Sequence, residues 1–194
     1  MPTDIFRVDS YEFAESDALF MDTNVWLYVY APQAPDDKRT RIYSRALANI
    51  LSAKSRIFID AMILSEFINR YSRLAYNLFK AAGSTIDFKE YRQSPDFKPV
   101  AKDIESSVRR ILKHCHRTES GFSECDIDSL LAKYGEGDSD FNDQLMVELC
   151  KSKGFKLITH DRDFKNCGVT VLTANNRLLA LARRLAGNTL LPEL

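Results

Sequence analysis

The chain has 194 residues, 45% of them hydrophobic, and its 27 basic residues are balanced by 27 acidic ones. This length fills one domain with an insertion more readily than two independent domains. A net charge of zero gives no overall field that attracts an anionic polymer, so any nucleic-acid contact must come from local patches. The four cysteines form no Cys-x-x-Cys pair, no apolar run approaches the ~20 residues of a membrane span, and the chain opens without a basic, apolar leader. These features predict a reduced, cytoplasmic setting with no membrane.

Residues 1–17 are weakly patterned, and we expect them to form a loose arm or an addition to a sheet edge, with residues 18–194 as the single domain. The first half of that domain alternates short apolar runs with helical periodicity. In chain order we predict a strand at 18–21, a helix of about two turns through Tyr30, a helix over 37–53, a strand over 56–60 and a helix over 61–82.

The pattern changes over residues 83–137, which contain several Gly and Pro residues and two amphipathic stretches, one near 104–115 and one near 127–131. So few apolar side chains would bury too little surface for an independent domain, so we interpret this segment as a helical insertion. After it we predict a helix over 140–153 capped by Asp138 or Ser139, strands over 155–159 and 169–173, and a closing helix over 175–186. This alternation predicts an α/β fold with a mostly parallel sheet and helices on both faces.

Four acidic residues occupy comparable places in these predicted elements. Asp22 and Asp161 each follow a strand directly, Glu66 lies shortly after another strand, and Asp143 lies in the first turn of the helix before Asp161. In a parallel sheet all four approach the carboxyl edge, where ligands bind in such folds. Carboxylates gathered there raise one another's pKa unless a cation lies among them. Oxygen ligands alone favour Mg²⁺ or Mn²⁺, so the sequence predicts metal-assisted hydrolysis of a phosphodiester.

Four motifs carry a resemblance to a known family: Met-Asp-Thr-Asn at 21–24, Leu-Ser-Glu-Phe at 64–67, Phe-Asn-Asp-Gln-Leu-Met-Val-Glu-Leu at 141–149, and Leu-Ile-Thr-His-Asp-Arg-Asp-Phe at 157–164. In this order they resemble the PIN domain. The resemblance implies a three-layer α/β/α sandwich and a Mg²⁺- or Mn²⁺-dependent nuclease that acts on single-stranded or structured RNA. It also implies the following roles: Asp22, Glu66, Asp143 and Asp161 as catalytic metal ligands, Asp163 as an extra ligand or a neighbour of one, and Asn24 as support for Asp22. Asp140 lies three residues before Asp143 on the same helix face and is either a second acid of the site or the helix cap.

A group of basic residues accompanies the amphipathic stretch near 104–115. Arg109, Arg110, Lys113 and Arg117 lie largely opposite the apolar stripe of their helix, where they either form a solvated face or hold an RNA backbone. The run His114-Cys115-His116 has no partner pair and does not predict a zinc site.

Together these features predict an endoribonuclease that uses a metal-activated water, with RNA as its partner. The resemblance leaves open a toxin restrained by an antitoxin, and the extra helices set the chain apart from the shorter toxins of the family. Homodimerisation and the role of the insertion are open as well. Two alternatives remain: a non-catalytic PIN-fold module that binds RNA or protein, and an aspartyl phosphatase of the haloacid dehalogenase type. The phosphatase would use Asp22 as nucleophile and needs an acid at position 24, where this chain has Asn24.

Overall fold

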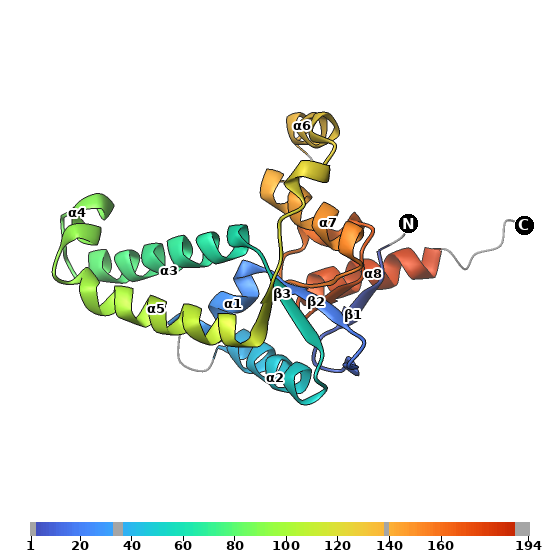
Figure 1. The fold of residues 1–194 in the computed structure, drawn as a ribbon, viewed down its shortest axis with the longest axis horizontal. Coiled ribbons are helices and arrows are strands. Elements are labelled where there is room, and N and C mark those ends of the chain that lie inside the picture. The colour runs from blue at the N-terminus through green and yellow to red at the C-terminus, as the bar shows by residue number, and fades with distance from the viewer. Residues whose placement is uncertain (1–2, 33–36, 138–139, 189–194) are drawn as a thin grey trace, which may run out of the picture.

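The computed structural model describes residues 3–32, 37–137 and 140–188. A six-stranded sheet in the order β1-β6-β5-β2-β3-β4 forms its centre, and every neighbouring pair of strands is parallel (Figure 1). The strands are β1 (Ile5–Arg7), β2 (Ala18–Met21), β3 (Arg56–Ile59), β4 (Cys115–Arg117), β5 (Lys156–Ile158) and β6 (Val171–Thr173). The predicted parallel sheet is therefore confirmed.

Helices flank the sheet, with α1, α2 and α3 on one side of the strands and α7 on the other (Figure 1). The helices are α1 (Thr23–Tyr30), α2 (Lys38–Ser52), α3 (Ala61–Ala81), α4 (Phe88–Gln93), α5 (Phe97–His114), α6 (Ile127–Gly135), α7 (Phe141–Lys153) and α8 (Asn176–Asn188), with short 3-10 turns η1 (Phe122–Glu124) and η2 (Asp163–Asn166). This arrangement confirms the three-layer α/β/α sandwich. No helix in the described ranges is long and apolar enough to cross a bilayer.

The winding direction of the sheet reverses between β2 and β5. From β2 the chain adds β3 and then β4 on one side, whereas β5 pairs with the other side of β2 and is followed by β6. Met21 is in register with Ile158, so the residues that follow these two strands emerge side by side. Such a reversal leaves a crevice at the carboxyl ends of the two strands, where ligands bind in open α/β sheets.

Three helices start at this carboxyl edge, and an aspartate caps each of them. The side chains of Asp22, Asp60 and Asp140 accept hydrogen bonds from backbone N–H groups in the first turns of α1, α3 and α7. Short polar side chains at this position satisfy amide groups that have no partner within the helix. Asp140 is thus the cap of α7, and the other predicted caps, Asp138 and Ser139, lie outside the described residues.

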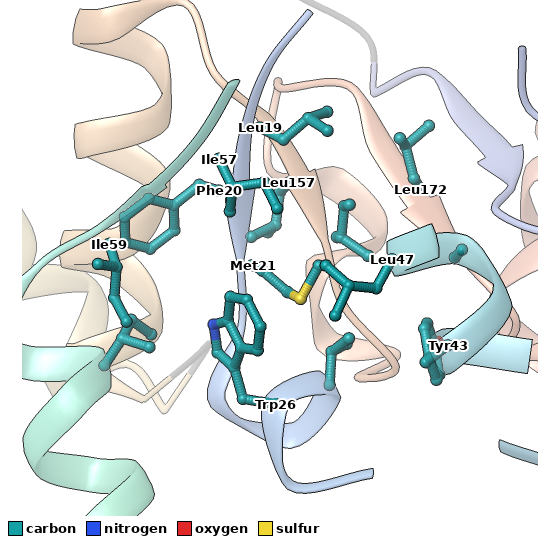
Figure 2. Close-up of a cluster of buried hydrophobic side chains, with 14 of the residues drawn as sticks. Leu19, Phe20, Met21, Trp26, Tyr43, Leu47, Ile57, Ile59, Leu157 and Leu172 are labelled. Carbon is teal, nitrogen blue, oxygen red and sulfur yellow. The ribbon is translucent and has the colours of Figure 1, made fainter. Parts of the chain in front are cut away.

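One part of the core lies between the sheet and the helices that follow β2 (Figure 2), and α7 and α8 contribute further buried residues. Trp26 from α1 and Tyr43 from α2 are fully buried beside Met21 and Leu157, which the two central strands contribute. Burial of side chains this large contributes roughly 2 to 3 kcal/mol each relative to exposure. Trp26 is therefore a core residue, and this packing fixes the direction in which α1 leaves Asp22.

One strand, β4, was not expected from the sequence, whereas β1 forms the sheet-edge addition that was one of the two expectations for residues 1–17. β1 lies within the predicted N-terminal arm and pairs with β6, and β4 lies within the predicted insertion and extends the sheet beyond β3. β4 carries the polar sequence Cys-His-Arg, which shows no strand pattern, whereas the equally short β5 and β6 lie within the longer runs predicted as strands over 155–159 and 169–173. α5 starts earlier than expected, at Phe97. The short helix α4, between α3 and α5, was not expected.

Candidate active site

Asp22 is buried at the reversal point, with only 6% of its surface exposed. The Thr159 hydroxyl donates to its Oδ2 at 2.6 Å, and the Asn24 side-chain amide donates to the same oxygen. Burial raises the pKa of Asp22 to about 6; the hydrogen bonds from Thr159 and Asn24 oppose this rise, and the charges of Glu66 and Asp161 add to it. Hydrogen bonds therefore fix the orientation of the Asp22 carboxylate, and other acidic side chains lie close enough to affect its pKa.

Glu66 and Asp161 are held at their places by local contacts. The Thr23 hydroxyl donates to Glu66 Oε2 at 3.0 Å, and the Arg70 guanidinium donates to Oε1 at 3.1 Å from one turn further along α3. Asp161 follows β5, and its Oδ1 accepts from the Asp163 backbone N–H at 3.0 Å. Both acids therefore lie at the carboxyl edge with part of their hydrogen-bonding capacity already used.

Asp143 is half-buried in the first turn of α7. Burial is the largest cause that raises its pKa to about 7, and the negative charges of Asp22, Asp161, Asp140 and Glu66 contribute the rest of the rise. The four acids predicted from the sequence thus lie close enough to oppose one another's ionisation. A carboxylate surrounded by like charges is a frequent mark of a functional site.

An all-oxygen, anionic donor set of this kind is the chemistry that Mg²⁺ and Mn²⁺ bind in proteins. After burial, the negative charges of neighbouring acids contribute to the raised pKa values of Asp22 and Asp143. In the part of the chain that the structure describes, however, no three His, Cys, Asp or Glu side chains are close enough to hold one ion. The donor chemistry therefore fits a divalent cation, whereas the side chains stand apart rather than gathered around a single point.

The remaining predicted residues lie farther from this group. Asp163 is exposed and lines a hollow of about 550 Å³ between α6, α7 and η2. Asp143 also borders this hollow, which is larger than a second one of about 300 Å³ beside Asp161. Arg109 pairs with Glu105 at 2.7 Å on the exposed face of α5, and the Arg110 guanidinium lies 4.8 Å from the centre of the Tyr30 ring. Lys113 lies near the end of α5, Arg117 ends β4, and neither of the two described hollows is lined by any of these four basic residues. Their role in substrate binding stays a prediction.

A polar network beside the acids was missing from the sequence expectations. The hydroxyl of the buried Tyr43 lies 2.9 Å from His160 Nδ1 and 3.2 Å from the Thr159 carbonyl, and it accepts from the Ala174 N–H at 3.0 Å. The Asn175 side chain donates to the His160 carbonyl at 2.7 Å. Burial lowers the pKa of His160, and burial raises the pKa of Tyr43 to about 12, so both are neutral near pH 7. Tyr43 lies on the apolar face of α2, so its sequence pattern indicated only a core position.

Comparisons with known proteins agree with this geometry. The model of the PIN domain matches residues 19–169, which include all four acids and the reversal of the sheet. No curated protein matches the sequence significantly. PIN domains are generally nucleases, and they typically use divalent metal ions. Because the match covers far more than half of the chain, this protein belongs to the PIN domain family.

Proposed function

We propose that this protein is a metal-dependent endoribonuclease. The observation that carries the proposal is the convergence of four carboxylates on the reversal point of the sheet, where their mutual repulsion helps to raise the pKa of Asp143 to about 7. A structural role for these acids would favour cationic partners, and among the residues that the structure describes only Glu66 has one, Arg70, within hydrogen-bonding distance. A site that ionises with difficulty is suited to bind a cation and, with it, a phosphodiester.

In this proposal Asp22, Glu66, Asp143 and Asp161 hold one or two Mg²⁺ or Mn²⁺ ions. The ions supply the positive charge that activates a water molecule and stabilises the phosphodiester during hydrolysis. Hydrogen bonds from Asn24 and Thr159 orient the Asp22 carboxylate. Hydrogen bonds from Thr23 and Arg70 orient the Glu66 carboxylate, so both acids are positioned before an ion binds. The basic residues Arg109, Arg110, Lys113 and Arg117 would contact the RNA backbone away from the acids, a part of the proposal that rests on the sequence.

A cleavage assay on single-stranded RNA with Mn²⁺ tests this function. We expect the wild-type protein to cut internal bonds and both Asp22→Asn and Asp143→Asn to lose that activity. Asp103→Asn is the matched control, because it removes the same charge from the exposed face of α5 and should cleave as the wild type does. Cleavage that persists in both Asp22→Asn and Asp143→Asn would refute the proposed site.

One observation favours a second candidate, a PIN-fold module that binds RNA or protein without cutting. The acids stand too far apart, among the described residues, for three of them to hold one ion. RNA binding with no cleavage in Mg²⁺ or Mn²⁺ would support this candidate. The aspartyl phosphatase is not proposed, because position 24 holds an amide that donates to Asp22 rather than an acid.

A narrower form of the nuclease proposal makes this protein the toxin of a toxin-antitoxin pair. Expression should then arrest growth, and Asp161→Asn or co-expression of a small antitoxin encoded next to it should restore growth. Arrest by wild type and Asp161→Asn alike would separate the toxicity from nuclease activity.

A further inference from the structure

A second hollow, of about 300 Å³, opens beside the acids on the side of Asp161 and Asn24. Its other walls come from four separate parts of the chain: Tyr28 of α1, Arg70 of α3, His160 and Arg162 around Asp161, and Asn175 before α8. The volume is at the small end of ligand sites, which occupy about 300 to 1,000 Å³. It therefore suits one compact group rather than a large ligand.

Two guanidinium groups make this hollow positive. Arg70 uses Nη1 for Glu66, and Arg162 makes a longer contact of 3.7 Å from Nε to Asp163, with side chains 50% and 64% exposed. Each guanidinium carries five N–H donors, so both retain donors for a ligand. Behind Tyr28, Arg39 lies 4.7 Å from the centre of the ring and donates to the Tyr28 hydroxyl, but its charge is paired with Asp37 at 2.6 Å.

Several contacts hold the wall that His160 and Tyr28 form. Tyr43 fixes Nδ1 of His160, Asn175 fixes the His160 carbonyl, and the His160 ring packs edge-on against both Tyr28 and Tyr43 at 5.5 and 5.7 Å. No hydrogen bond within the described residues uses Nε2 of His160, so this nitrogen stays available. A fixed wall with a free polar atom positions a ligand more closely than a mobile surface side chain does.

We propose that this hollow binds a backbone phosphate of the RNA strand, one that neighbours the phosphodiester at the acids. The inference rests on the proposed nuclease function. A strand that passes four carboxylates needs positive charge close by, and guanidinium groups match phosphate oxygens in geometry as well as in charge. The larger hollow is the poorer place for such a phosphate, because its walls carry three lysines, Lys133, Lys151 and Lys165, against four acids, Glu136, Asp143, Glu148 and Asp163.

Binding of a fluorescein-labelled 12-nucleotide oligouridylate tests the inference apart from cleavage. The background is Asp143→Asn in EDTA, where nothing is cut and the repulsion at the site is reduced. We expect the added pair of Arg70→Ala and Arg162→Ala to weaken binding at least fivefold. The slope of log K against log salt should also become shallower by about 0.7, the value for one phosphate contact on a single strand.

Arg45→Ala is the matched control, because it removes an arginine from the exposed face of α2. We expect it to leave the affinity for the oligouridylate and the salt slope nearly unchanged. Unchanged affinity and slope in the double variant, with thermal melts showing a folded protein, would overturn the inference. The two proposals fail separately. Binding lost in the double variant while the wild type cuts nothing refutes the nuclease alone, and cleavage by the wild type with binding retained in the double variant refutes the phosphate site alone.

Discussion

Two regions of this molecule differ in how their charged side chains are surrounded. One is the helical arm, defined here as the outer half of α3 (residues 71–81), α4 and the first turns of α5 (residues 97–104), which projects from the sheet in Figure 1. Its charged side chains have favourable partners: Asp87 and Glu90 accept from each other's backbone N–H in a reciprocal capping box, and the Arg73 guanidinium lies 3.7 Å from the centre of the Phe88 ring. The capping-box pair is three residues apart, and Arg73 and Phe88 lie on the neighbouring helices α3 and α4.

The other region is the carboxyl edge of β2 and β5, where charges of the same sign face one another across long sequence separations. Asp22, Glu66, Asp143 and Asp161 come from four elements, and their mutual effect is to make ionisation harder. The arm is thus arranged for stability, whereas the edge gives up stability. Such a loss is the usual consequence of a site that is arranged for binding or catalysis.

The largest expected effect is on catalysis, from a substitution at the carboxyl edge. Asp161→Asn keeps an oxygen that can accept from the Asp163 N–H and removes only the charge. We expect the rate of Mn²⁺-dependent RNA cleavage to fall on the order of 10³-fold, about 4 kcal/mol of transition-state stabilisation. Arg73→Ala in the arm should change the rate less than twofold. Equal losses in the two variants would mean that the arm takes part in the reaction.

The next effect concerns the stability of the arm. Tyr91 is 2% exposed and contacts Phe79 and Phe97, with ring centres 4.6 and 5.4 Å away. Removal of a buried aromatic ring leaves a cavity, so Tyr91→Ala should lower the free energy of unfolding by about 3 kcal/mol. Urea denaturation measures this loss, and proteolysis should become faster near α4. Mn²⁺-dependent cleavage should persist in the folded fraction, because the edge does not depend on this packing.

A smaller effect of opposite sign is expected at the edge. The folded-state pKa of Asp143 is about 7, above its ordinary value of 3.8, so the folded protein binds the extra proton between these values. Stability from this group is complete below pH 4 and is lost as the pH rises toward 7. Asp143→Asn should therefore stabilise the metal-free protein at pH 7.5 by about 1 to 3 kcal/mol, allowing for solvent screening of a half-buried group.

Denaturation at two pH values measures the Asp143 effect. The difference between variant and wild type should nearly vanish at pH 4. Saturating Mg²⁺ should stabilise the wild type more than the variant, because the ion binds only the folded site. A variant that is less stable than wild type at pH 7.5 would mean that Asp143 makes a favourable contact and is not a strained acid.

The same contrast explains how much the sequence could predict. Strand ends, helix periodicity and four short motifs located Asp22, Glu66, Asp143 and Asp161, because each acid follows a local pattern. β4 escaped because its sequence, Cys-His-Arg, is polar and shows no strand pattern, and its pairing with β3 depends on long-range contacts. β1 was covered only by the expectation that residues 1–17 form either an arm or an addition to a sheet edge. The Tyr43 and Asn175 contacts with His160 escaped for a related reason: they join residues more than a hundred positions apart or pass through backbone carbonyls.

The smallest expected effect concerns two basic residues between the two regions, Arg117 and Arg109. Arg117 ends β4 beside Ile59, so it reaches the same edge as the acids, whereas Arg109 pairs with Glu105 on α5. An exposed pair of this kind is worth only about 0.3 to 0.5 kcal/mol, so Arg109→Ala should scarcely alter stability. In RNA binding we expect Arg117→Ala to make the salt slope shallower by up to 0.7 and Arg109→Ala to change it less. The reverse order would place the RNA along α5 and make the insertion, rather than the sheet edge, the principal RNA surface.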